Sequence, residues 1–168
     1  MNINISANDI ISSVKKRLVI IGKHHATKSG DTLFSTSVLS SAEIQTLSEF
    51  VAEGIRMVAA ELAPFIHAVS DEGVSFDNTR LRPAHLNAIE RAAVGYLTAY
   101  TTERTLEMTL PDIAKPYADE AQNLLVSLVR LTYSKTPPAG TIDTLDSMTG
   151  KVYLDDDVDD TEADSSGN

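Results

Sequence analysis

Apolar residues recur at steps of three and four in several stretches of the chain, the spacing that places side chains along one stripe of a helix. The clearest stretch covers residues 41–66, with large apolar positions at Ile44, Leu47, Val51, Ile55, Val58, Leu62 and Phe65. Ser40 and Glu43 have the capping-box spacing, which predicts that this helix starts at Ser40 or Ser41. Pro64 lacks an amide proton, so we expect the helix to end near Glu61 and Pro64 to open a short second turn. Because one helix cannot bury its own stripe, we place it near the centre of a helical domain.

Three further helices are predicted by the same spacing. The first runs from about Ala7 to Ile21 and ends at Gly22, a natural left-handed cap. Another runs from Pro83 to Thr101, and its small residues leave one side thin enough for a close neighbour. The segment from Thr101 to Thr109 either continues this helix or forms a connector. The last helix covers about Asp112 to Tyr133 and is followed by two prolines, which terminate it.

The remaining segments have loop or strand character. Val74–Phe76 is a short extended candidate between turn residues, and residues 23–36 are polar, without a sustained period, and predict an exposed loop. Residues 141–154 are enriched in Thr, Ile, Val and Tyr, which indicates a small hairpin or extended arm. The sequence therefore predicts a mainly α protein: a four-helix bundle-like domain over residues 1–138, and an extended arm with an acidic tail over residues 139–168.

Charge is distributed unevenly along the chain. The protein has 168 residues and a formal net charge of −10. Residues 151–168 hold one basic residue against seven acidic ones, a net −6, whereas residues 1–28 hold five basic residues against one acidic, a net +4. Identical subunits set head to tail would bring a basic start against an acidic neighbour. By composition the acidic tail is expected to be disordered in isolation, unless another chain holds it.

Some classes of protein are disfavoured by composition. The absence of cysteine excludes disulfides, thiolate zinc sites and a cysteine nucleophile. The start of the chain does not resemble a secretory signal, and the apolar run Leu18–Ile21 is far shorter than the ~20 residues of a membrane helix. We therefore expect no membrane role.

No constellation of residues predicts catalysis. His24 and His25 are adjacent in a stretch with lysines, which disfavours a metal site, and His67 and His85 are interpreted as surface or cap residues. No catalytic triad can be assembled from the spacing. The stretch 19–23, VIIGK, lacks the first Gly and the Ser or Thr of a phosphate loop. We expect no enzyme activity, no catalytic residues and no cofactor.

Two charged clusters allow weaker hypotheses. Asp155, Asp157 and Asp159 match the first ligand positions of a calcium loop, but the turn Gly and the closing Glu are missing, so we favour a solvated or partner-docked tail without a metal. The cluster Lys15–Arg17 lies on the expected outer face of the first helix. With few aromatic residues and an acidic whole, specific nucleic-acid binding is not expected.

The order of these elements resembles the small head-to-tail connector, or adaptor, proteins of tailed bacteriophages. The resemblance covers roughly Ser6 to Lys135 and is one of architecture, without a diagnostic motif. It consists of a capped first helix, the long helix SSAEIQTLSEFVAEGIRMVAAEL, a short extended excursion, the Ala-rich helix PAHLNAIERAAVGYLTAYTTER, and a final helix with an early Pro and Tyr, LPDIAKPYADEAQNLLVSLVRLTYSK. The very acidic tail and the long first loop depart from the family's pattern.

The resemblance implies a structural virion protein. Family members form a ring under the portal, twelvefold by the resemblance, dock to the portal through terminal segments and seat later tail or neck proteins. It further implies that genomic DNA passes through the ring without specific binding, that the protein is assembled in the bacterial host cytoplasm, and that the acidic arm is the first candidate for docking. The alternative left open is a small cytoplasmic helical regulatory or binding module, which would be a stable monomer or dimer with an apolar groove.

Overall fold

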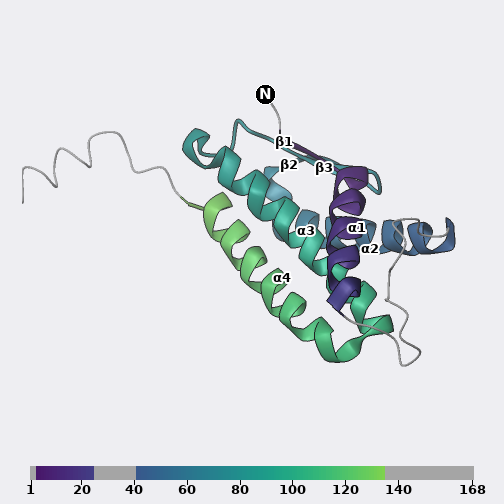
Figure 1. Cartoon of the computed structure of the whole chain (residues 1–168). Helices are drawn as coiled ribbons and strands as arrows, with labels where there is room; N and C mark the ends of the chain where they lie inside the picture. The colour runs from purple at the N-terminus through teal and green to yellow at the C-terminus, as the bar shows by residue number, and fades with distance from the viewer. Residues whose placement is uncertain (1–2, 25–40, 135–168) are drawn as a thin grey trace, which may run out of the picture. The chain divides into compact units, whose positions relative to one another are not determined.

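The computed structural model describes residues 3–24 and 41–134, which form four α-helices and a three-stranded antiparallel sheet (Figure 1). In chain order these are β1 (Ile3–Ser6), α1 (Ala7–His24), α2 (Ser41–Glu61), β2 (Ile66–Ser70), β3 (Gly73–Phe76), α3 (Leu86–Thr109) and α4 (Pro111–Thr132). The prediction of a mainly α domain with four helices is confirmed. The predicted arm and tail over residues 139–168, and most of the predicted loop over residues 23–36, lie outside the described residues.

The start and the end of α2 match the prediction. The helix begins at Ser41 and its regular turns end at Glu61, after which Ala63–Phe65 form a single 3-10 turn with the proline in its first positions. Pro64 has no amide proton to continue the α-helical ladder, so the chain tightens into this turn and enters β2. The break therefore sets the point at which the long helix gives way to the sheet.

α3 packs against each of the three other helices, and most extensively against α4. It continues through the threonine-rich segment to Thr109, and Leu110 alone separates it from α4, so the two helices form a hairpin and lie side by side (Figure 1). The thin side expected of α3 permits this close packing, since a Cβ built on Gly95 would lie 3.2 Å from Cδ1 of Leu124 in α4. Pro116 is accommodated inside α4, near its first turns.

Two predicted helix boundaries were wrong. α3 begins at Leu86 rather than Pro83, because Pro83–His85 form a 3-10 turn before it. α1 was expected to end at Gly22, but it continues to His24, and Gly22 is a buried residue within it. A glycine in a helix costs about 1 kcal/mol relative to alanine, an amount that tertiary packing of the helix outweighs here. The left-handed cap inferred at this position is therefore absent.

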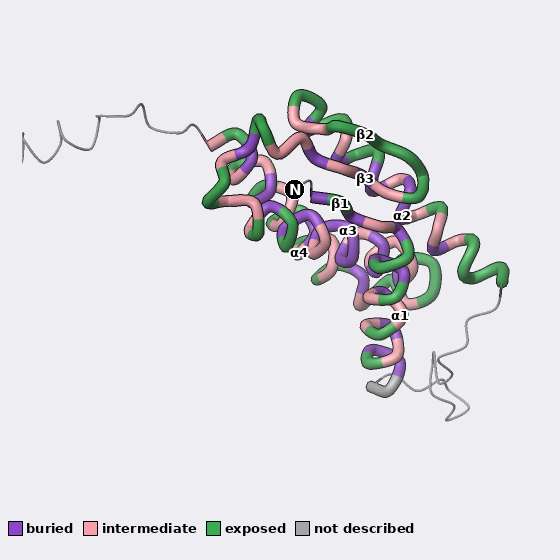
Figure 2. The backbone as a smooth tube through the Cα atoms, turned by 90° about the horizontal axis from the view of Figure 1, so that it is seen from above, coloured by how far each residue is buried: buried purple, intermediate pink, exposed green. Residues whose placement is uncertain are grey.

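The sheet was only partly predicted. The extended candidate Val74–Phe76 is confirmed as the greater part of β3, the central strand, with β1 and β2 antiparallel on either side of it. Ile3 and Ile5 of β1 lie opposite Phe76 and Val74, and all four side chains are buried against the helices. β2 is largely exposed along its length (Figure 2). β1 and β2 were not predicted from the sequence.

One continuous core joins the sheet to the helices. The predicted stripes of α1 and α2 supply much of it, and Val14, Val51, Ile55, Val58 and Leu62 have no exposed surface. The first turn of α2 lies beyond this core, because all its residues from Ser41 to Gln45 are exposed (Figure 2). This overhanging turn forms one wall of the pocket described next.

Candidate functional site: an apolar pocket at the junction of three helices

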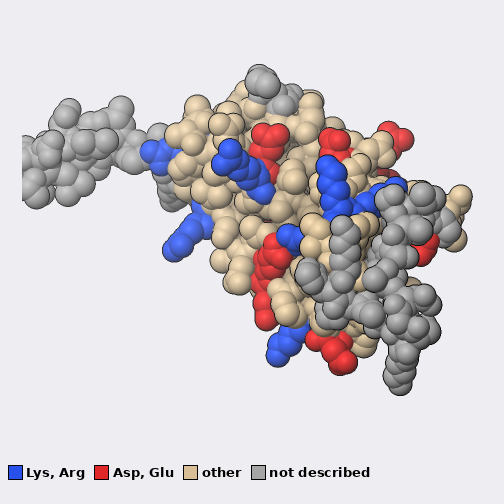
Figure 3. Space-filling view, viewed as in Figure 1, with Lys and Arg blue, Asp and Glu red and all other residues tan. Residues whose placement is uncertain are grey.

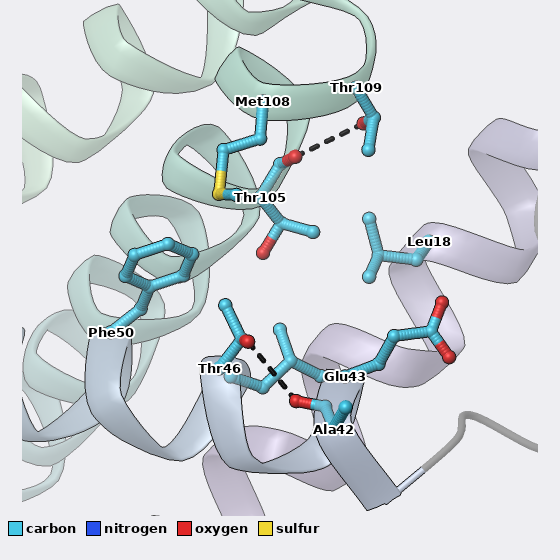
Figure 4. A pocket seen from close by; sticks show the side chains of 9 residues that line it. Leu18, Ala42, Glu43, Thr46, Phe50, Thr105, Met108 and Thr109 are labelled. Carbon is cyan, nitrogen blue, oxygen red and sulfur yellow. Dashed lines mark hydrogen bonds between the residues drawn. The ribbon is translucent and has the colours of Figure 1, made fainter.

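An apolar pocket of about 210 Å³ opens where the start of α2 and the end of α3 meet the second half of α1 (Figure 4). Leu18 of α1 forms one wall, Phe50 and Thr46 of α2 form the second, and Thr105 and Met108 of α3 form the third. Each of these helices belongs to the core through other residues, so the pocket is built on rigid elements. Its position follows from the overhang of α2, which leaves the ends of the helices without a covering layer among the described residues.

The threonines of the pocket present little hydrogen-bonding capacity. The hydroxyl of Thr46 donates to the carbonyl oxygen of Ala42 at 3.1 Å, and the hydroxyl of Thr109 donates to that of Thr105 at 3.0 Å (Figure 4). Thr105 bonds in the same way to the carbonyl oxygen of Thr101 at 2.7 Å. Since each hydroxyl is directed back onto its own helix, the methyl group of the side chain remains to line the pocket. The pocket is therefore suited to an apolar occupant.

The rim of the pocket combines exposed apolar and acidic side chains. Met108 is 71% exposed and Ile44, in the overhanging turn, is 37% exposed. Glu43 lines the pocket, with its carboxylate extended toward the Leu18 side (Figure 4). Glu107 is exposed as well, and it pairs with Arg104, whose guanidinium faces the Phe50 ring of the pocket wall. An apolar hollow within an acidic rim is the kind of surface that receives an apolar side chain flanked by basic groups.

A cluster of polar and aromatic groups adjoins the pocket behind Phe50. The guanidinium of Arg104 lies 5.8 Å from the centre of the Phe50 ring, and its Nη1 donates to Oε2 of Glu107 at 2.8 Å. Nε of Arg104 lies 3.8 Å from Oε2 of Glu53, and this nitrogen is buried without a hydrogen-bond partner among the described residues. Arg104 therefore holds one wall of the pocket and partly neutralises the carboxylates around it.

Burial keeps the tyrosines of this cluster protonated. Tyr96 and Tyr100 stack with their ring centres 5.8 Å apart. Burial, followed by the nearby Glu53 and Glu61 carboxylates, raises the pKa of Tyr96 to about 12. Burial and a hydrogen bond with Glu53 raise the pKa of Tyr100 above its ordinary value. A tyrosine with a raised pKa is a weaker acid and is not activated as a nucleophile at neutral pH, so this pair serves packing.

A carboxyl group on the outer side of α3 is also perturbed. Desolvation, and next to it the charge of Glu107, raise the pKa of Glu103, while Arg104 opposes the change. The combined charge of Glu53, Glu103 and Glu107 thus exceeds what one arginine balances. Carboxylates therefore outnumber arginines in this cluster.

The basic cluster predicted on α1 is divided by the fold. Nη1 and Nη2 of Arg17 donate to Oε2 and Oε1 of Glu120 in α4 at 3.0 and 2.9 Å, and its guanidinium lies 5.5 Å from the centre of the Tyr117 ring. Arg17 is therefore a half-buried link between α1 and α4. Lys16 remains exposed and Lys15 half-buried on the outward side of the helix. Over the face shown in Figure 3, positive and negative side chains are interspersed.

The histidines are placed separately. His67 is exposed in β2, while Nδ1 of His85, just before α3, lies 2.8 Å from Oγ of Ser134 and 3.3 Å from the carbonyl oxygen of Leu131. His85 thus links the start of α3 to the end of α4. Only the backbone of His24 is described, and His25 and the Asp155–Asp159 cluster lie outside the described residues. Across residues 3–24 and 41–134, no group of three or more metal-ligating side chains converges, and no helix is long and apolar enough to cross a membrane.

The sequence did not predict the pocket, because its walls combine residues from three distant segments. Met108 and Thr109 belong to the stretch whose helical state was left open, and the exposure of Met108 depends on where α3 ends. The signal in the sequence was a methionine near the end of the threonine-rich stretch 101–109. No family model, curated protein or solved structure matches this chain.

Proposed function

We propose that this chain is a structural subunit that assembles with copies of itself, as a head-to-tail connector of a tailed bacteriophage. In this role it forms a ring between the portal and the tail in the virion and does no chemistry. DNA passes through the ring without sequence-specific contacts, and portal and tail proteins are its other partners.

The observation that carries the proposal is the order of the elements. After β1, a first helix is followed by a long helix broken at Pro64 and by a short antiparallel excursion formed by β2 and β3, which β1 joins. A helix with a thin small-residue side and a final helix containing Pro116 come next. This order supports the resemblance to the connector family, on which the virion role depends.

The surface of the described residues is also suited to assembly. Large apolar side chains are exposed on separate elements, with Ile20 of α1 60%, Val69 of β2 50% and Met108 of α3 71% exposed. A ring subunit needs two different contact faces, because each copy contacts one neighbour on each side. Separate apolar positions on several faces meet this requirement.

The experiment is a mass measurement of the full chain by light scattering over a range of concentrations, with negative-stain microscopy of the same samples. The proposal predicts particles of several times 18.1 kDa and ring-shaped images, alone or with a portal protein. A clean monomer at high concentration in both situations contradicts it. The same measurement on the chain lacking residues 154–168 tests whether the acidic tail takes part in assembly.

The alternative, a small helical binding module, is favoured by one observation, the apolar pocket beside α2. In that case the protein is a stable monomer or dimer, and the pocket binds an apolar segment of an unrelated protein. A monomer that retains its mass at all concentrations and whose Met108 environment changes on addition of an apolar helical peptide supports the module over the connector.

A further inference from the structure

We propose that the apolar pocket of one copy receives Ile20 from α1 of a second copy, so that identical chains join head to tail. This inference rests on the proposed function as a self-assembling subunit, and it assigns the two surfaces that form the contact. One surface is the pocket, and the other is the outward side of α1 around Ile20, whose side chain enters the pocket.

The size and chemistry of the pocket match a single aliphatic side chain. Cavities of about 150 Å³ lined by apolar side chains hold a molecule the size of benzene, so a pocket of about 210 Å³ has room for one isoleucine together with the edge of its neighbours. Ligand pockets for drug-sized molecules are larger, from about 300 Å³ upward. The hydroxyls of Thr46 and Thr109 are directed onto their own helices, which leaves the occupant nothing polar to bond on these walls.

Ile20 is the exposed apolar residue whose surroundings fit the rim. It is 60% exposed and lies beside Val19, Lys15 and Lys16 on the outward side of α1. Glu43 lines the pocket, and Glu107 lies near its Phe50 wall, where it pairs with Arg104. An isoleucine flanked by two lysines is complementary to an apolar hollow flanked by acidic side chains.

Val126 and Val69, two other exposed apolar residues, lack such surroundings. Val126 has Arg130 one turn along α4, on a face it shares with Gln122 and Asn123. Val69 lies one residue from the turn that contains Asp71 and Glu72, whose charges would oppose the acidic rim. Of these positions, Ile20 alone is adjacent to two lysines.

The positions of the two surfaces require a contact between copies. Leu18 lines the pocket, and Ile20 follows it by two residues, or about 200° around a helix of 3.6 residues per turn. The two side chains therefore project from nearly opposite sides of α1, and Ile20 points away from the pocket of its own copy. A contact between two different surfaces of identical chains repeats from copy to copy and closes into a ring where the rotation permits.

Cross-linking tests the contact directly, because the chain contains no cysteine and single cysteines can be introduced without background. Tagged Ile20→Cys is mixed with untagged Met108→Cys at a concentration where the chain assembles, and the mixture is treated with a short bis-maleimide. The proposal predicts a covalent dimer containing one of each chain. The matched control replaces Ile20→Cys with Val126→Cys, an exposed residue on α4, which is expected to give at least tenfold less product with the same partner.

A second variant tests the energetic role of the side chain. Ile20→Asp introduces a charge on an exposed position, so it is expected to keep the helical circular dichroism of the wild type and to weaken self-association at least tenfold, whereas Val126→Asp leaves self-association within twofold. Cross-links at equal yield for both cysteine pairs, or assembly unaffected by Ile20→Asp, overturn the proposal. If the wild-type chain assembles but the Ile20→Cys and Met108→Cys chains do not cross-link, only this contact is overturned. A wild-type chain that stays monomeric overturns the self-assembly on which both proposals rest.

Discussion

Gly73 is the position where one added methyl group is expected to have the largest effect on the fold. It begins β3, and a Cβ built there would lie 2.4 Å from the carbonyl oxygen of Ile5 in β1. Ordinary contact begins at 3.4 Å, so the two atoms would have to separate by 1.0 Å. The obstacle is main chain rather than a flexible side-chain end, so Gly73→Ala forces β1 away from β3.

The expected loss of stability follows from the two buried isoleucines of β1. Ile3 and Ile5 are 6% and 4% exposed, and they are buried by the pairing that the substitution disrupts. Overpacking in a well-packed site costs about 1–3 kcal/mol, and uncovering a large apolar side chain costs about 1.5–3 kcal/mol. Because the strand will retreat only partly, we expect Gly73→Ala to lower the free energy of unfolding by about 2–4 kcal/mol.

Gly95→Ala is the matched control, since it adds the same methyl group in α3. There the Cβ would lie 3.2 Å from Cδ1 of Leu124, only 0.2 Å inside ordinary contact, and the leucine end can rotate away. Replacing glycine by alanine within a helix is worth about 1 kcal/mol. Gly95→Ala is therefore expected to be neutral or stabilising, by up to about 1 kcal/mol.

Urea denaturation of both variants, followed by circular dichroism, measures the two free energies. A change of about 0.5 kcal/mol or less is typical of an unconstrained surface site. If the free energy of unfolding of Gly73→Ala lies that close to the wild-type value, then β1 does not approach β3 at Gly73 as described. An equal loss in both variants would mean that the methyl group, rather than the carbonyl it meets, determines the cost.

Three other predictions concern single interactions. Arg17 and Glu120 form a bidentate ion pair whose side chains are 31% and 38% exposed. Replacing them by alanine, singly and together, should therefore give a coupling energy of about 0.5–1 kcal/mol. A coupling energy that does not decrease in about 1 M salt would contradict this. Thr101→Val should stabilise the protein by about 1 kcal/mol in thermal denaturation, since this buried hydroxyl has no partner among the described residues, whereas Thr102→Val, which removes a satisfied hydroxyl, should destabilise it. Burial raises the pKa of Tyr96 to about 12, whereas a tyrosine in the unfolded chain has a pKa of about 10. The stability that buried Tyr96 confers is therefore complete below about pH 10 and is lost as the pH rises toward 12. Tyr96→Phe should flatten the fall in stability over this range, and an unchanged fall would count against the burial of the Tyr96 hydroxyl.

The helices were predictable because their signals are local and repeat over many residues. The apolar stripe from Leu47 to Leu62 is buried in the core. α2 ends before Pro64 because proline has no amide proton to donate to the helix. The short strands β1 and β2 were missed for the opposite reason. Four or five residues carry too little alternation to be distinguished from loop, and their extended form depends on pairing with β3 in the native register.

The candidate site was beyond the reach of sequence reasoning. Its shape depends on how far α3 extends before Leu110 and on the overhang of the first turn of α2, both of which tertiary packing decides. Likewise, Arg17 has the same helical surroundings in the sequence as Lys16. Only the placement of α4 turns one of them toward Glu120 and leaves the other in solvent.

The central claim is that this chain is made to join copies of itself, and the mass of the purified full chain in solution tests it most directly. Light scattering across a wide range of concentrations should give a mass that rises from 18.1 kDa to a fixed multiple of that value. A mass that stays at 18.1 kDa up to the highest concentration, both alone and with a portal protein, would contradict the claim.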